Sequence, residues 1–329
     1  MTTSASSFVA ISDVHLNPFD KSQKYPEISQ DANPYYLERM VGSMAYEATH
    51  NSSTPEFIAI TGDMLAHGFP EKYKNNPDKS ICGDGVSACV LKTMDKIVST
   101  LRKTQNGVFA CTPIYLALGN NDSNVDDYVI DTDFLSSLGG RYYDYSHPCN
   151  PNAAEKSKFI AAFKEGGGAY SAKTPIKDFN LVVLNSVLYA NKHPKCVQQK
   201  NDDCTAVRSQ QNKFIEQYSS SSPAPSLVLL HIPPFDDTAG YDNQAKPALD
   251  GKIFAGPQTY TIAGHWHMYA KLRAVDGVML NAITYRKGVR PGFGIFSFKN
   301  NHVSLSKHCQ ITNPNSLPGK TIPLPISCS

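Results

Sequence analysis

The sequence predicts an α/β fold in which two packed sheets are flanked by helices. Up to His231, apolar runs typical of strands alternate with helical patterns, and after His231 the chain is mostly strand-like. Short runs of consecutive apolar residues are typical of buried strands. Helices interleaved with strands, followed by further strands, favour sheets that are covered by helices. No internal repeat is visible in the sequence.

The first half of the chain is expected to alternate strands with helices. Strands are expected at residues 8–13, 57–63 and 114–118 because each is a short apolar run. Apolar residues three and four positions apart predict helices around residues 37–45 and 90–101. Between the second strand and the second helix, residues 68–85 are rich in Gly, Pro, Asn and Lys and predict a loop at the rim.

The second half is expected to open with an irregular stretch and to close with strands. Residues 124–168 look irregular, with one short helix near residues 156–164, and residues 166–168 are three glycines that we interpret as a flexible turn. A helix is expected to carry Val207, Phe214, Ile215 and Tyr218 on one face. The later strands are expected at residues 178–185, 258–264, 268–275, 278–283, 293–298 and 303–308.

The domain organisation is expected to be simple. A chain of 329 residues exceeds the usual domain length of about 150, but large α/β layers reach this size as single units. We expect one domain over residues 1–310. Residues 311–329 form a short Pro- and Ser-rich tail that we expect to be tethered by a disulfide at Cys328.

Charge and hydropathy exclude two classes of partner. The 31 basic and 29 acidic residues give a net charge of +2, without a basic stripe of the kind that binds nucleic acid. No stretch approaches the roughly 20 apolar residues that cross a bilayer, so we expect no integral membrane segment. Residues 1–7 are too short and polar for a signal peptide, so the chain is expected to be either cytosolic or a mature form without its leader.

Cysteine usage favours the second of these expectations. Most of the eight cysteines lie in polar, loop-like sequence, which suggests disulfides and an oxidising compartment. We therefore expect a secreted, periplasmic or organelle-lumen protein rather than a cytoplasmic one. Local pairs are expected at Cys196–Cys204 and Cys309–Cys328, and Asn51 lies in a glycosylation sequon.

Seven side chains of metal-binding type follow the ends of predicted strands. In α/β sheets ligand sites form at strand ends, so side chains from five such ends are expected to meet. Carboxylates can bridge two cations, and imidazoles suit zinc, iron or manganese. The sequence therefore predicts a site for two divalent metal ions. The candidate ligands are Asp13, His15, Asp63, Asn120, His231, His265 and His267.

These residues occur in the order Asp-x-His, Gly-Asp, Gly-Asn-Asn-Asp, a lone His and Gly-His-x-His, which resembles the calcineurin-like metallophosphoesterase superfamily. The resemblance implies a four-layer α-β-β-α sandwich and makes residues 1–310 a catalytic domain. It also implies that Asp63 bridges two metals, for which zinc is the expected ion and iron or manganese are alternatives. The first metal would be held by Asp13, His15, Asp63 and His267, and the second by Asp63, Asn120, His231 and His265.

Several segments resemble the acid-sphingomyelinase-like phosphodiesterase branch of that superfamily. Gly62-Asp63-Met64-Leu65-Ala66-His67 looks like its Gly-Asp-x-x-x-His, and His231-Ile232-Pro233-Pro234 matches its His-Ile-Pro-Pro. Residues 184–191 and 281–293 are similar to two further segments of the branch. The saposin-like domain of acid sphingomyelinase has no counterpart here, so soluble phosphoesters are favoured over a lipid in a bilayer.

The chain departs from the family pattern at Asn121, where the usual residue is His, and in this it resembles endopolyphosphatase-type members. An amide can donate a hydrogen bond to phosphate but cannot transfer a proton. Asn121 is therefore a candidate substrate contact, and His67 is the candidate catalytic acid. Asp122 is expected to orient the ligands from behind. Tyr189, Trp266 and Tyr285 are candidate aromatic walls for a base or a cationic head group.

The resemblance implies a binuclear-metal phosphodiesterase in which a metal-bound hydroxide attacks a soluble phosphodiester or phosphoanhydride, of nucleotide or choline type. The alternative that Asn121 favours is a hydrolase of polyphosphate or nucleotide polyphosphate. A further alternative is a non-catalytic protein that binds a phosphate ligand. The expected partner is a small-molecule phosphoester, with no nucleic acid as a structural partner, and the sequence leaves the oligomeric state open.

Overall fold

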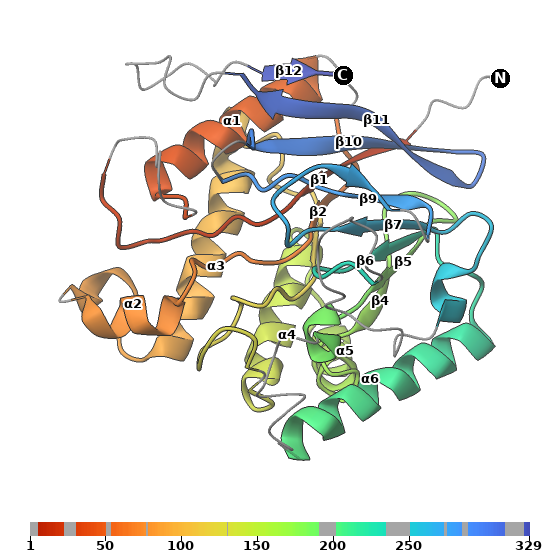
Figure 1. The fold of residues 1–329 in the computed structure, drawn as a ribbon, viewed down its shortest axis with the longest axis horizontal. Helices are drawn as coiled ribbons and strands as arrows, with labels where there is room; N and C mark the ends of the chain where they lie inside the picture. The colour runs from red at the N-terminus through yellow and green to blue at the C-terminus, as the bar shows by residue number, and fades with distance from the viewer. Residues whose placement is uncertain are drawn as a thin grey trace.

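Two mixed sheets of six strands each form the centre of the computed structural model (Figure 1). The structure describes residues 6–22, 31–50, 54–76, 78–129, 131–190, 202–234, 251–272, 275–284, 289–312 and 326–329. The first sheet has, in spatial order, β12 (Ile326–Cys328), β11 (His302–Ile311), β10 (Gly292–Lys299), β1 (Ser6–Ile11), β2 (Ile58–Ile60) and β3 (Ile114–Leu116).

The second sheet also combines parallel and antiparallel pairs. Its four central strands run parallel to one another, and an antiparallel strand lies at each edge. In spatial order the strands are β4 (Tyr170–Lys173), β5 (Asn180–Val183), β6 (Leu227–Leu229), β7 (Tyr260–Ala263), β9 (Gly277–Met279) and β8 (Ala270–Lys271).

A cluster of phenylalanines joins the two sheets. Phe8 of β1 stacks on Phe57 and on Phe296 of β10, with ring centroids 4.5 and 5.1 Å apart. Phe179, which precedes β5 of the second sheet, meets Phe8 edge-on at 5.8 Å and Phe298 at 4.9 Å. Aromatic rings of this size contribute much of the apolar area that a core buries. The predicted pair of packed sheets is therefore confirmed.

Helices flank the sheets, as predicted (Figure 1). The apolar faces predicted around residues 37–45 and 90–101 are buried in α1 and α3. None of the helices in the described ranges is long and apolar enough to cross a membrane. The α-helices are α1 (Pro34–His50), α2 (Phe69–Asn75), α3 (Val86–Lys103), α4 (Phe134–Ser146), α5 (Ala153–Glu165) and α6 (Asp202–Ser221); the 3₁₀ helices are η1 (Lys79–Ile81), η2 (Thr104–Gly107), η3 (Ser186–Tyr189) and η5 (Gly251–Phe254).

Two expected loops contain helices, so these expectations were wrong. The predicted rim loop over residues 68–85 contains α2, where Pro70 is compatible with the first helical turn and Phe69 and Tyr73 are buried. The stretch that we expected to be irregular contains α4, which packs against α5. A Cβ on Gly139 of α4 would lie 3.1 Å from the Phe163 ring, so this glycine, although a weak helix former, permits the close packing.

Three disulfides lie in the described residues. Cys309–Cys328 joins β11 to β12, which confirms the predicted pair; the others are Cys82–Cys89 and Cys111–Cys149. Cys89 and Cys309 are buried within α3 and β11, so the expectation that they lie in loops was wrong. The expected Cys196–Cys204 pair and the Asn51 sequon lie outside the part of the chain whose side chains are described.

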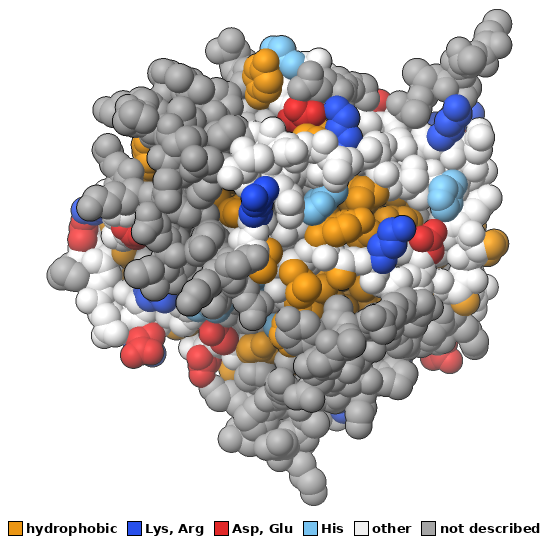
Figure 2. Space-filling model, turned by 45° about the horizontal axis from the view of Figure 1, so that its top comes forward, with side chains coloured by type: hydrophobic (Ala, Val, Ile, Leu, Met, Phe, Trp, Pro, Cys, Tyr) orange, Lys and Arg blue, Asp and Glu red, His pale blue; other side chains and the backbone are white. Residues whose placement is uncertain are grey.

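The surface carries dispersed charge on the face shown in Figure 2. The described Lys and Arg side chains are separated on this face and do not form a basic stripe. Among the described residues, the large apolar side chains that are clearly exposed are Tyr46, Val108 and Val125. A few exposed apolar residues are normal on a protein surface.

Candidate metal centre

The seven predicted ligands follow the carboxyl ends of five parallel strands. Asp13 and His15 follow β1, Asp63 follows β2, and Asn120 follows β3. From the second sheet, His231 follows β6, while His265 and His267 follow β7. The sheets touch at this edge, where Ser12 and Ala282 form a parallel bridge. The fold therefore directs residues from distant parts of the chain to one place.

The backbone of this region is strained at five of the seven positions. The φ angle is positive at Asp13 (50°), His15 (45°), Asp63 (50°), His265 (78°) and His267 (59°). A positive φ is uncommon for residues other than glycine and costs on the order of 1 kcal/mol or more each. This turn of the backbone also explains why β1 and β2 end at Ile11 and Ile60, before the predicted ends at residues 13 and 63.

One group of side chains gathers around His15. Its Nε2 lies 2.9 Å from Nε2 of His267 and 3.6 Å from Oδ2 of Asp63. Oδ1 of Asp13 lies 3.4 Å from Nε2 of His267. These four residues are the set predicted for the first metal, and the structure brings them together.

A second group gathers around His231. Its Nε2 lies 2.9 Å from Oδ1 of Asn120, 3.2 Å from Nδ1 of His265 and 3.3 Å from Oδ2 of Asp63. These are the residues predicted for the second metal. The same oxygen of Asp63 lies beside both groups, which is the position that a bridging carboxylate requires.

Hydrogen bonds on the far sides of two rings show that the groups fit a cation. Nδ1 of His15 donates to the carbonyl oxygen of Leu65 at 3.2 Å, and Nδ1 of His231 donates to that of Thr61 at 2.8 Å. In the neutral rings Nε2 therefore carries a lone pair. That of His231 faces the oxygens of Asn120 and Asp63, and that of His15 faces Oδ2 of Asp63 beside Nε2 of His267. Facing lone pairs repel unless a positive charge lies between them, so the donor set suits divalent metal ions.

The charges of the site agree with this interpretation. Burial raises the pKa of Asp63, but His231 and His15 outweigh it and hold the pKa below its usual value, so the carboxylate is ionised. Burial opposes protonation of His231, yet Asp63 raises its pKa to about 9. Burial, with His231, lowers the pKa of His265 to about 3. The centre thus attracts positive charge at Nε2 of His231 and keeps His265 neutral, as a ligand must be.

Asn121 donates both of its nearby N–H groups to Asp63. Its backbone N–H donates to Oδ1 and its side-chain Nδ2 donates to Oδ2, each at 2.8 Å. A carboxylate offers about four lone-pair sites, so about two remain for cations. The amide donor that we expected to contact phosphate is thus directed to the shared carboxylate in this structure.

Asp122 lies behind the ligands and ties two loops together. One of its oxygens accepts from the backbone N–H groups of Met64 (2.8 Å) and Leu65 (3.2 Å), and the other accepts from Gly119 (2.9 Å). Burial and the charge of Asp63 raise the pKa of Asp122 to about 7. This geometry is compatible with the orienting role predicted for Asp122.

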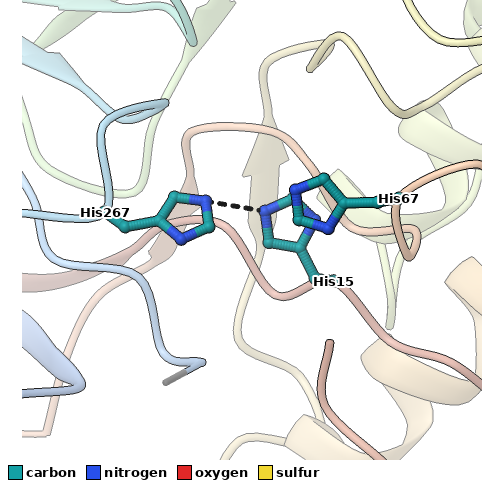
Figure 3. A group of neighbouring side chains, drawn as sticks. All are labelled: His15, His67 and His267. Atoms are coloured by element: carbon teal, nitrogen blue, oxygen red, sulfur yellow. Dashed lines mark hydrogen bonds between the residues drawn. The ribbon is translucent and has the colours of Figure 1, made fainter. Parts of the chain in front are cut away.

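His67 lies beside the first group. Its ring stacks on that of His15, with centroids 4.1 Å apart and 14° between the planes. Ring nitrogens of His15, His67 and His267 lie within 4.8 Å of one another, and Figure 3 shows the rings of His15 and His67 directed toward His267. Nδ1 of His67 is bonded to Asp31, a residue that the sequence analysis missed because no motif marks it.

The predicted aromatic contacts differ in their placement. Trp266 is half-buried with its ring 5.0 Å from that of His265. Tyr189 is only 3% exposed and its hydroxyl donates to Asn212 of α6, so its ring is not presented to solvent. Tyr285 lies outside the described residues.

Tyr128 is a site neighbour that the sequence analysis did not identify. Its φ is 64°, its N–H donates to the carbonyl oxygen of Asn120, and its ring meets that of His265 edge-on at 6.3 Å. A positive φ at a bulky residue is rare and clusters at functional sites. Sequence alone carries no signal for it, since the conformation depends on the fold.

Comparisons with known proteins agree with this geometry. A family model described as calcineurin-like phosphoesterase matches residues 6–269. Acid sphingomyelinase-like phosphodiesterase 3b from Homo sapiens is 27% identical over 247 residues, which cover 69% of this chain and 48% of the human protein. The chain thus spans about half the length of that relative.

Two solved structures align along most of this chain. Calcineurin-like phosphoesterase YfkN from Bacillus subtilis aligns with a TM-score of 0.43 and 11% identity, over 92% of this chain and 89% of that one. The NAD nucleotidase of Haemophilus influenzae aligns with a TM-score of 0.41 and 10% identity, over 93% and 49% of the two chains. On the family match, which covers most of its length, the chain belongs to the calcineurin-like phosphoesterase family.

Proposed function

We propose that this protein is a binuclear-metal phosphodiesterase of the acid-sphingomyelinase-like type, acting on soluble phosphodiesters or phosphoanhydrides. The observation that carries the proposal is the position of Asp63, whose Oδ2 lies 3.6 Å from Nε2 of His15 and 3.3 Å from Nε2 of His231. The match to a phosphoesterase family and the similarity to a human acid sphingomyelinase-like phosphodiesterase support the reaction class.

The residues divide into two ligand sets that share Asp63. When bound, two neighbouring cations would stabilise charge on a phosphoryl oxygen and lower the pKa of a water molecule. Zinc is the metal that we propose, because imidazole nitrogens and carboxylate oxygens are its usual ligands. Asp13, His15 and His267 would complete the first set; Asn120, His231 and His265 would complete the second.

The chain's own residues would orient the substrate and handle the proton. His67 offers an imidazole next to the first set and is the proposed donor of a proton to the leaving oxygen. Asn121 cannot transfer a proton at ordinary pH. The side-chain amide of Asn121 donates a hydrogen bond to Asp63. We propose that Asn121 keeps this hydrogen bond when it contacts the phosphate. Trp266 would form a wall for a nucleoside or choline-type group.

The absence of an imidazole at position 121 favours a second candidate substrate class. General-acid catalysis is typically worth about 10²- to 10⁴-fold, and a leaving group that is itself a phosphate needs little of it. A hydrolase of polyphosphate or nucleotide polyphosphate on the same centre is therefore the alternative. The three disulfides support a secreted or lumenal location for either enzyme.

Kinetics of the zinc-loaded protein would test the proposal. We expect turnover of bis-p-nitrophenyl phosphate, and we would compare it with a nucleoside triphosphate and polyphosphate to separate the two candidates. Asn121→His should speed cleavage of esters with poor leaving groups by at least about 10-fold relative to p-nitrophenyl esters. Asn121→Ala controls for the lost bond to Asp63. Absence of turnover of any phosphoester between about pH 4 and 9, the range over which carboxylates and imidazoles titrate, would refute the function.

A further inference from the structure

Asp31 holds His67 through two hydrogen bonds. One oxygen of its carboxylate accepts from the ring Nδ1 of His67 at 2.8 Å and from the backbone N–H of the same residue at 3.1 Å. Asp31 is buried, with 7% of its surface exposed, so water competes weakly for this carboxylate. Two bonds to one oxygen fix both the ring and the backbone that carries it.

Asp31 is itself anchored to the ligand loop after β1. Its neighbour Ala32 donates to the carbonyl oxygen of His15 at 2.8 Å, and the N–H of Asn17 donates to the carbonyl oxygen of Ala32 at 2.8 Å. The backbone next to Asp31 is therefore hydrogen-bonded to the loop that carries His15, a predicted metal ligand. Any displacement of Asp31 relative to His15 would break these backbone bonds.

Lys72 of α2 restrains the carboxylate from the other side. Its Nζ lies 3.3 Å from the second oxygen of Asp31 and donates to the carbonyl oxygen of His67 at 2.5 Å. Lys72 thus offsets the negative charge of the buried Asp31 carboxylate and links Asp31 to the backbone of His67. Such paired contacts are how buried charges are kept in place.

The bond to Asp31 also selects one tautomer of His67. A carboxylate accepts but does not donate, so Nδ1 carries the proton and Nε2 is directed away from Asp31. The stack on His15 restricts rotation of the ring, and Figure 3 shows the ring directed toward His267. We propose that Asp31 is a positioning residue that holds the Nδ1–H of His67, so that Nε2 faces the metal centre. In the protonated ring Nε2 then carries the proton given to the leaving oxygen, and the neutral ring left after the transfer is the Nδ1–H tautomer.

This inference rests on the proposed function, in which His67 gives a proton to the leaving group. It adds Asp31, which lies outside the family motifs, as the carboxylate that holds His67 in place. The nearby Asp127 provides a matched control. Asp127 accepts only from the backbone N–H of Gly68, at 3.2 and 3.3 Å from its two oxygens, in the hydrogen bonds observed. It lies next to the same loop but does not bond the His67 ring.

The test compares Asp31→Asn, Asp31→Glu and Asp127→Asn with the parent, all loaded with zinc. Histidine ¹⁵N NMR, recorded at a pH where the His67 ring is neutral, should show Nδ1–H for His67 in the parent and in Asp127→Asn, and a mixture of tautomers in Asp31→Asn. With aryl phosphodiesters of increasing leaving-group pKa, Asp31→Asn should lose at least about 10-fold on the poorest leaving group and less than about 3-fold on p-nitrophenol. Asp31→Glu should recover part of that loss because it restores a carboxylate.

Several results would overturn the inference. The first is an Nε2–H tautomer of His67 in the parent. The second is that Asp31→Asn and Asp127→Asn show the same tautomers and the same loss of rate on poor leaving groups. The third is loss of zinc from Asp31→Asn, which would make Asp31 a support of the His15 loop instead. The parent spectrum decides the tautomer even if the variants fail to fold. If the parent cleaves no ester, the proposed function is wrong. The NMR spectrum still tests separately whether Asp31 fixes the tautomer of His67.

Discussion

Replacement of Gly264 by alanine should damage the metal centre although no predicted ligand is itself replaced. Gly264 precedes His265, and a Cβ at this position would lie 2.7 Å from Oδ2 of Asp13 and 2.7 Å from Oγ1 of Thr61. It would also collide with the hydroxyl of Ser12. Carbon atoms in proteins do not approach oxygens this closely, so the carboxylate or the β7 end must move.

The losses of stability and metal affinity in Gly264→Ala depend on the movement of Asp13 or His265. The backbone N–H of His265 donates to both oxygens of Asp13 at 3.1 Å, so moving either residue weakens a charge-assisted hydrogen bond. Overpacking of a tight site costs about 1–3 kcal/mol of stability. Disturbing groups that orient metal ligands typically costs about 10- to 100-fold in metal affinity. We expect Gly264→Ala to show both losses.

Zinc competition titrations and urea unfolding of the metal-free protein would measure the two losses separately. Gly42→Ala is the matched control, because Gly42 lies in α1 and a Cβ there meets nothing within 4 Å. It should leave zinc affinity unchanged and stabilise the helix by about 0.5–1 kcal/mol. The reasoning is refuted if Gly264→Ala binds zinc as tightly as Gly42→Ala and unfolds at the same urea concentration.

Two further predictions concern stability away from the centre. Cys111–Cys149 closes a loop with a sequence separation of 38 and Cys82–Cys89 one of 7, so changing both cysteines of a pair to serine should cost about 4 and about 2 kcal/mol respectively. Urea unfolding of the two double variants checks this order, and equal losses would count against loop entropy as the cause. Burial lowers the pKa of His308 below its usual 6.5, so the unfolded chain takes up this proton more readily and stability should fall as pH drops below about 6.5. His308→Gln should flatten that fall between about pH 6.5 and 5 in urea titrations, and an unchanged slope would show that other groups cause it.

The strand-end pattern was sufficient to predict which distant side chains the fold brings together. Polar residues directly after apolar runs marked Asp13, Asp63 and His231, and the structure brings them together because parallel strands end at one edge. Apolar residues three and four positions apart predicted the buried faces of α1 and α3. Strand ends and buried helix faces depend on short segments of sequence, so they can be predicted from the periodicity and spacing of apolar residues.

Features that depend on contacts between distant segments were not predictable. Helix α4 contains Gly139-Gly140, which lowers helix propensity, and it forms because it packs closely on Phe163 of α5. Asp31 reaches His67 only in the folded chain, and no spacing relates the two. Tyr189 was expected at the substrate, but its hydroxyl turns toward α6.

A zinc-edge anomalous difference map from crystals of the zinc-loaded protein would show whether the two ligand groups bind a pair of metal ions. We expect two peaks about 3.5–4 Å apart, one on each side of Oδ2 of Asp63. One peak should lie among the side chains of the His15 group and the other among those of the His231 group. A single peak, or peaks that do not contact Asp63, would contradict a binuclear centre.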